Sequence, residues 1–439
     1  MKTMWNRTVV LAAILALAGC CAPSVAAGVP ERPQAAHPKA TRAEYDAYQA
    51  AASEKNPQQK VALLDAFVAK YPNSEYLSYV YNEYWQAYVA LKQWTKVIEY
   101  LDKLLALPEL NAGAKLEYYY RRAATFEYAY NSKSPDLADA STKARDAALA
   151  GLKALNEFSK PAQATEEQWT TFKKTYTTQF YNTAASASFY LKDYKSAAED
   201  YHSALGVEPQ QPVDDYRMGI ADLLESPPQN VAGFWALARA IDLKVPDADK
   251  VTAFLRDKIS AYQTPGCDSS LDAQVKELLT LAQNSQDPPA GFTIPSAADL
   301  AKVREAANIQ TVLADLKAGG DKGKLTWLAV CNGQFPEALA KAYDVNTATP
   351  DAFVIKAAVG ITEDELNAST AANADLKIAA GQPNVARLEK DSIFRFSGKL
   401  TGYTPDPFYM TWDNVTVNPE DIPEEKGKKP AKRPGKAKP

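Results

Sequence analysis

Cysteine is the residue type with the clearest chemical potential in this chain, because its four copies fall into two groups. Cys20 and Cys21 follow an apolar N-terminal segment, whereas Cys267 and Cys331 lie far along the chain, at the two ends of a largely helical stretch. In an oxidising compartment an even pair of cysteines indicates a disulfide between Cys267 and Cys331. Two separate buried thiols are the alternative, since only side-chain geometry decides between them.

Histidine is too scarce to support the commoner catalytic and metal sites. The chain has only His37 and His202, which argues against a histidine-based metal site and against a Ser-His-Asp triad. His37 lies in an Ala/Pro-rich segment without a second ligand nearby. His202 has only Asp200 and Ser203 as polar neighbours, so we expect both histidines to be solvated or structural.

Other motifs for catalysis or cofactor binding are missing. Residues 319–325 (GGDKGKL) are similar to a phosphate-binding loop, but one residue is missing before the Gly-Lys pair and Leu325 replaces the required Ser or Thr. A helix end followed by a turn explains these glycines better. We therefore expect no cofactor, no metal and no enzymatic activity. A hydrolase that uses two carboxylates needs no fixed spacing in the sequence and stays open as an alternative.

The N-terminus is predicted to be an export signal. Lys2 and Arg7 precede an uncharged apolar run at 9–18, which is too short for a membrane-spanning helix of about 20 residues. The run ends in Leu17-Ala18-Gly19-Cys20, which resembles the lipobox of bacterial lipoproteins. That resemblance implies removal of the signal peptide at 1–19 and lipid attachment to the sulfur of Cys20.

This interpretation predicts a location in the cell envelope, anchored by lipid on the periplasmic side of a bacterial membrane. A plain signal peptide cut near the small residues 24–26 would instead give a soluble periplasmic or secreted protein. Either signal exports the chain. Residues 20–41, rich in Ala and Pro, are expected to form a tether.

Charge is divided unevenly along the chain. The net charge is −4, but residues 426–439 carry seven Lys or Arg and no acidic residue. The acidic remainder disfavours nucleic acid as a partner, because phosphate binding needs clustered cations. We expect 424–439 to be a disordered basic tail that contacts anionic surfaces, with a merely solubilising role as the alternative.

Two windows about 100 residues apart share one pattern of apolar spacing. In each, residues three or four apart form a stripe on a first helix, an aromatic follows a short turn, and a second stripe ends at a proline. The residues expected to pack these helices are Tyr84, Trp85 and Trp94 in the first window, and Tyr181, Ala184, Tyr194, Ala197, Tyr201 and Pro209 in the second.

This pattern resembles the tetratricopeptide repeat (TPR) family. The resemblance implies a solenoid of helical hairpins over 42–265, whose surface binds a protein or peptide partner. It is specific for the fold and weak for the function, because such repeats bind many unrelated partners.

The remainder of the chain is predicted to change from helix to strand. Residues 266–345 are expected to form a helical connector that carries the cysteine pair, and 346–423 a small β-rich domain, either barrel or sandwich. Gly398 and Gly402 beside one strand are similar to the bent strands of OB-like barrels.

Together these features predict a mainly α protein that acts as a membrane-tethered or secreted envelope scaffold. The alternative is an envelope carbohydrate-binding protein or hydrolase that uses the β-rich domain.

Overall fold

The computed structural model describes residues 41–424, except 109, 265 and 350–351. The described residues form two units. The repeat unit lies within Met1–Leu255 and Glu277–Phe292, and the barrel unit within Arg256–Lys276 and Thr293–Pro439. The predicted signal peptide, the tether, Cys20 and residues 425–439 of the tail lie outside the described residues.

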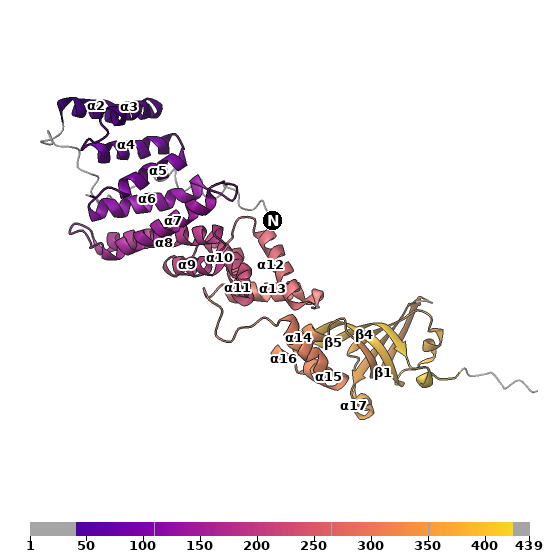
Figure 1. The fold of residues 1–439 in the computed structure, drawn as a ribbon. Helices are drawn as coiled ribbons and strands as arrows, with labels where there is room; N and C mark the ends of the chain where they lie inside the picture. Colours follow the sequence, from indigo (N-terminus) through magenta and orange to yellow (C-terminus); the bar gives the residue numbers. More distant parts are fainter. Residues whose placement is uncertain (1–40, 109, 265, 350–351, 425–439) are drawn as a thin grey trace, which may run out of the picture. The chain divides into compact units, whose positions relative to one another are not determined.

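The repeat unit is a stack of helices, drawn from indigo to magenta in Figure 1. Each helix packs against the next, and α2 also contacts α4, as α6 contacts α8. This is the solenoid of helical hairpins that the resemblance implies. Its helices are α2 (Arg42–Ser53), α3 (Pro57–Lys70), α4 (Leu77–Ala90), α5 (Trp94–Leu105), α6 (Ala112–Ala129), α7 (Leu137–Glu157), α8 (Glu166–Tyr190), α9 (Tyr194–Val207), α10 (Pro212–Leu224) and α11 (Asn230–Asp242).

The two matching windows use the same turn between their helices. In both, a lysine in the left-handed region reverses the chain: Lys92 has φ 56° and Lys192 has φ 63°. Lys244, after α11, has φ 61° and completes a third copy of this turn. In each copy the lysine follows a leucine, and its amide donates to the carbonyl three residues earlier. The repeated hairpins therefore share a turn conformation as well as a pattern of apolar residues.

Small residues bring consecutive helices of the repeat unit into close contact. Ala184 and Ala185 of α8 are fully buried, Ala184 against α6 and α7 and Ala185 against α9. Between α10 and α11, a Cβ at Gly219 would lie 2.9 Å from the carbonyl oxygen of Gly233. Glycine is required there because any side chain would push these helices apart.

The repeat unit differs from the predicted span 42–265. α12 (Ala248–Gln263) and α13 (Asp268–Ala282) each begin in one unit and end in the other. Residues 277–292 belong to the repeat unit because their segment packs on α11. There the Trp235 indole and the Arg239 guanidinium both donate to the Ser285 carbonyl, at 3.2 and 2.8 Å. Such long-range contacts have no local sequence pattern.

The barrel unit contains five strands in the closed order β1-β2-β3-β5-β4, with β3 and β5 parallel and the other pairs antiparallel. Of the two predicted alternatives, barrel and sandwich, the structure shows a barrel. Its strands are β1 (Gln334–Thr349), β2 (Ala352–Gly360), β3 (Ala374–Ile378), β4 (Ile393–Pro405) and β5 (Phe408–Val417). The register between β4 and β5 shifts between Ser397 and Lys399, at Gly398, and again between Leu400 and Gly402.

The boundary predicted at 346 is wrong by twelve residues, since β1 begins at Gln334. The residues of β1 in the core are Phe335 near its start and then Ala338, Ala340 and Ala342. Alanine favours helix and lacks the bulk of typical strand residues, so this strand does not read as one in the sequence.

The predicted connector 266–345 is not a separate domain either. α14 (Ala297–Ala306), α15 (Ile309–Ala318) and α16 (Gly320–Val330) share one hydrophobic core with the barrel. α14 and α15 are separate helices because Asn308 caps the start of α15. A short helix, α17 (Glu363–Ala368), follows β2, and Trp412 lies fully buried in the barrel.

Candidate functional site

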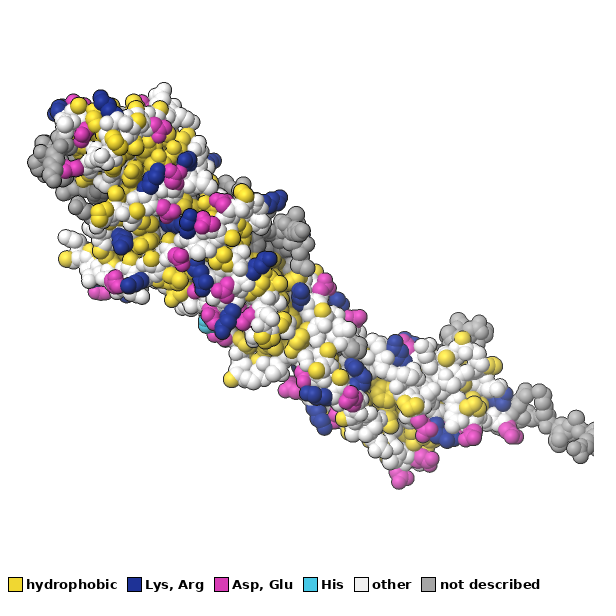
Figure 2. All heavy atoms as spheres, in the orientation of Figure 1, with side chains coloured by type: hydrophobic (Ala, Val, Ile, Leu, Met, Phe, Trp, Pro, Cys, Tyr) yellow, Lys and Arg dark blue, Asp and Glu magenta, His cyan; other side chains and the backbone are white. Residues whose placement is uncertain are grey.

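The first helices of successive hairpins touch one another through their side chains. We name the surface formed by α4, α6, α8 and α10 the first-helix face. Its residues are Tyr81, Trp85, Glu117, Arg121, Glu127, Asn182, Ser186, Asp214 and Arg217. Figure 2 shows hydrophobic side chains at the surface of the repeat unit, mixed with charges of both signs.

The N-terminal part of the first-helix face is aromatic. Trp85 of α4 is half-buried, and its indole nitrogen donates to Asn82 at 2.9 Å. The Arg121 guanidinium of α6 lies 5.9 Å from the indole ring, and Glu117 holds that guanidinium at 2.6 Å. Tyr81 lies one turn before Trp85 on the same helix and is also half-buried. Two half-buried aromatic rings therefore lie close together on α4, and the indole nitrogen of one of them, Trp85, has a hydrogen-bond partner.

The C-terminal part of the first-helix face is a polar network. Arg217 of α10 donates to both carboxylate oxygens of Glu127 on α6, at 2.7 and 3.2 Å. The Ser186 hydroxyl of α8 also donates to Glu127 and lies 3.0 Å from the Tyr201 hydroxyl of α9. Burial opposes ionisation of Glu127, but Arg217 and Ser186 outweigh it and hold the pKa of this carboxyl below its usual value.

Asp214 extends this network at the start of α10. It accepts a hydrogen bond from the Asn182 amide of α8 at 2.9 Å. Burial raises the pKa of Asp214 to about 6, although Arg217 and Asn182 act in the opposite direction. On this part of the face Arg217 and Glu127 are paired with each other, and Asp214 has the neutral Asn182 amide as its partner.

The residues expected to pack the repeats lie at the predicted hairpins, with different degrees of burial. Tyr84, Ala184, Ala197 and Tyr201 are buried in the core. Trp94 and Tyr194, the aromatic residues that follow the turns, are half-buried. Tyr194 contacts Phe189 with ring centroids 5.3 Å apart. Trp85 and Tyr181 are half-buried on first helices, and Pro209 is exposed after α9.

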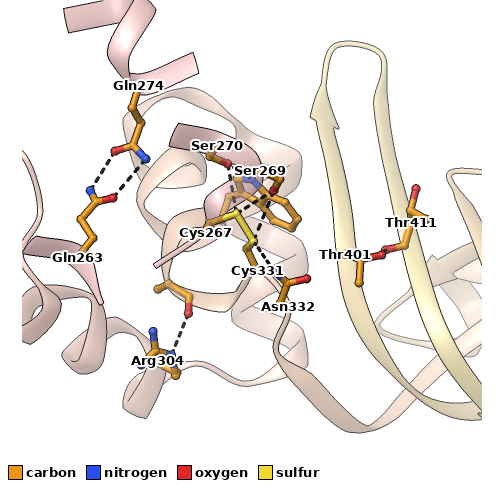
Figure 3. The surroundings of a disulfide bond; sticks show 12 residues. Gln263, Cys267, Ser269, Ser270, Gln274, Arg304, Cys331, Asn332, Thr401 and Thr411 are labelled. Carbon is orange, nitrogen blue, oxygen red and sulfur yellow. Dashed lines mark hydrogen bonds between the residues drawn. A yellow bond between two sulfur atoms is a disulfide. The ribbon is translucent and has the colours of Figure 1, made fainter. Parts of the chain in front are cut away.

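Cys267 and Cys331 lie together in the barrel unit, joined by a disulfide (Figure 3). Their Cα atoms are 5.6 Å apart, although 64 positions separate them in the sequence. Ser269 and Ser270 surround the Cys267 sulfur, and the Trp327 indole donates to Ser270 at 2.7 Å. The bond ties the start of α13 to the end of α16.

Sequence reasoning missed the Glu127–Arg217 network, because its members are scattered over 90 positions and follow no motif. His202 is exposed and lies 3.0 Å from Asp287. Within the described residues, no cluster of three or more His, Cys, Asp or Glu side chains could hold a metal ion. Among the described helices, none is both long and apolar enough to cross a membrane.

No family model matches the sequence, and no curated protein matches it. Among solved structures, the C-terminal part of a TPR repeat-containing protein from Cytophaga hutchinsonii is 11% identical. The similarity covers 56% of this chain and 96% of that one, with a TM-score of 0.26. The TPR2AB domain of yeast Sti1, in a complex with pHSP90, is 16% identical over 55% of this chain and 86% of that one, with a TM-score of 0.17.

Proposed function

We propose that this protein is a non-catalytic scaffold of the bacterial cell envelope, whose repeat unit binds a protein or peptide partner through the first-helix face. The observation that carries the proposal is the half-buried Trp85, stacked beside Arg121 and one turn from Tyr81. Trp, Tyr and Arg dominate the binding energy of protein interfaces, because they bury large area at low entropic cost.

The charges of the first-helix face determine what kind of binding to expect. Arg121 is paired with Glu117, and Arg217 with Glu127. Because these pairs are internal, a partner gains little from long-range attraction, and its affinity comes from the aromatic rings. We therefore expect binding at this face to be nearly insensitive to salt.

A crosslinking experiment in the producing cells tests this surface. A photoreactive phenylalanine analogue replaces Trp85 in the full chain, and the same analogue at Leu149 of α7 serves as control, since Leu149 is 43% exposed on a second helix. We expect a discrete adduct from position 85 that is absent from position 149. Equal adducts from both positions, or none from 85, would contradict the proposal.

Purified protein gives a second measurement. With the partner identified from the adduct, Trp85→Ala should weaken binding at least about tenfold, as a hot-spot truncation of about 1.4 kcal/mol or more does. Leu149→Ala should leave the affinity unchanged. Similar losses from both variants would mean that the partner does not recognise this face.

The location in the envelope is supported by Leu17-Ala18-Gly19-Cys20 at the end of the apolar run, and by a cysteine pair suited to an oxidising compartment. We expect the wild-type protein to partition into detergent with the mass of a lipid-modified chain. Cys20→Ala should be unprocessed or soluble. Unchanged mass and membrane association in Cys20→Ala would refute lipidation.

The basic tail is proposed to contact anionic lipid or cell-wall polymer through its seven cations at 426–439. Each cation near an anionic lipid surface contributes about 1 kcal/mol, screened by salt. Deletion of 426–439 should weaken binding to anionic liposomes, and added salt should weaken binding by the intact protein. Equal, salt-insensitive binding by both forms would leave only a solubilising role.

A further inference from the structure

A pocket of about 630 Å³ opens in the repeat unit between α9, α10, α11 and the segment 286–288. Its volume is typical of small-molecule and side-chain sites. Apolar side chains form its floor, among them Met218 and Trp235, which are both buried. None of the residues named for the first-helix face lines the pocket, although α10 contributes to both.

Asp222 of α10 lines this pocket although it is only 8% exposed. Its main-chain oxygen accepts a hydrogen bond from the Gln229 amide. No described residue donates a hydrogen bond to its carboxylate or forms an ion pair with it. Burial and the nearby charge of Glu225 raise the pKa of Asp222 to about 7. A buried carboxylate without a counter-charge is costly, so such a group at the wall of a pocket points to a ligand that supplies one.

The other charged groups that line the pocket also favour a cationic ligand. Carboxylates of Glu199, Glu225 and Asp287 also line the pocket, against one lysine, Lys195. Lys195 lies 3.9 Å from Glu199, and His202 lies 3.0 Å from Asp287. The acidic rim disfavours an anion, and a neutral ligand would leave Asp222 unpaired. A bare metal ion is too small for this volume and would meet only one buried carboxylate.

We propose that this pocket binds an alkylammonium group, whose methylene stem lies on the Met218–Trp235 floor and whose charged head pairs with Asp222. Lysine-like stems pack on apolar surface while their ammonium groups form charge-assisted hydrogen bonds. The same chemistry is present in a lysine side chain of a partner and in a free diamine or polyamine.

Calorimetric titration of the full chain at pH 8 distinguishes the two sources. The probes are 1,5-diaminopentane and a capped pentapeptide with one central lysine, together with the same peptide acetylated on that lysine. We expect saturable binding of at least one ammonium probe and none of the acetylated peptide. Tighter binding of the lysine peptide indicates a partner side chain, and tighter binding of the diamine indicates a free amine.

Two variants test the site, one by removing its charge and one by filling its volume. Asp222→Asn should weaken binding at least tenfold, whereas Asp249→Asn, which removes an exposed carboxylate of α12, should change it less than twofold. Ala232→Phe fills the pocket without altering its charge and should also abolish binding. Failure of both ammonium probes to bind, or unchanged binding by Asp222→Asn, would overturn the proposal.

Discussion

Arg217 of α10 and Glu127 of α6 form a two-pronged ion pair, although 90 positions separate them in the sequence. The carboxylate of Glu127 also accepts from Ser186 of α8, which in turn lies 3.0 Å from the hydroxyl of Tyr201 on α9. One carboxylate thus connects helices of three successive hairpins. Because each contact requires a particular register, this network fixes how these hairpins stack.

Glu127→Gln tests the energetic contribution of this network. The variant keeps the shape of the side chain but removes the charge that pairs with Arg217. The side chains of Glu127 and Arg217 are largely shielded from water, at 30% and 15% exposed. We expect the free energy of unfolding to fall by about 1–3 kcal/mol. Urea unfolding followed by the helical circular dichroism signal gives this value.

The control for this prediction is Glu99→Gln. Glu99 accepts from Lys96 and Lys103 at 2.7 Å on the exposed surface of α5. Surface pairs contribute about 0–1 kcal/mol, so the control should change stability little. Equal losses from the two variants would show that the Glu127 network contributes no more than a surface pair.

Two tyrosines of one hairpin allow a second comparison. Tyr201 is fully buried and its hydroxyl contacts Ser186, so Tyr201→Ala should destabilise the repeat unit by about 3–5 kcal/mol. Tyr194 is half-buried behind the turn, and Tyr194→Ala should cost about 1–2 kcal/mol. The same urea titration measures both. A larger loss from Tyr194→Ala would mean that the aromatic behind the turn, not Tyr201, anchors this hairpin.

The parts of the fold that sequence predicts well are those with local causes. The hairpins of α4–α5 and α8–α9 follow from apolar spacings of three and four residues and from the aromatic residue after each short turn. The strands β4 and β5 follow from runs of aromatic and β-branched residues. In each case neighbours along the chain supply the signal.

The features that sequence could not predict depend on distant residues. Three of the core positions of β1 are alanine, and this segment becomes a strand because β2 and β4 pair with it. The Glu127–Arg217 pair and the pocket around Asp222 assemble side chains from separate helices. None of these residues has a distinguishing neighbour in the sequence, so only the tertiary structure identifies them.

The raised pKa of Asp222 predicts that the free energy of unfolding depends on pH. Burial, with the charge of Glu225, raises its pKa from 3.8 to about 7 in the folded protein. Between about pH 4 and 7 the folded state therefore holds a proton that the unfolded state has lost, and stability falls as the pH rises through this range. Asp214 and Asp215, with pKa values raised by burial to about 6, add to the same trend.

Asp222→Asn removes one of these protons and should make the decline shallower. One proton corresponds to a slope of about 1.4 kcal/mol per pH unit. Urea unfolding at several pH values from 4 to 8 measures the slope, with Asp249→Asn as the exposed control. A slope that Asp222→Asn leaves unchanged would show that this carboxyl titrates normally in the folded protein.

The disulfide between Cys267 and Cys331 predicts a redox-dependent stability of the barrel unit. The bond joins positions 64 apart, and closure of a loop of that length contributes about 4 kcal/mol in the chain-entropy model. We expect Cys331→Ser to lose about this much stability relative to the oxidised wild type. A reductant should lower the stability of the wild type to that of the variant and leave the variant unchanged.

Peptide mapping without reductant, on protein isolated from the producing cells, should recover the two cysteines in one linked pair of peptides. Two free thiols that react fully with an alkylating agent, together with stability that does not respond to reductant, would exclude the bond.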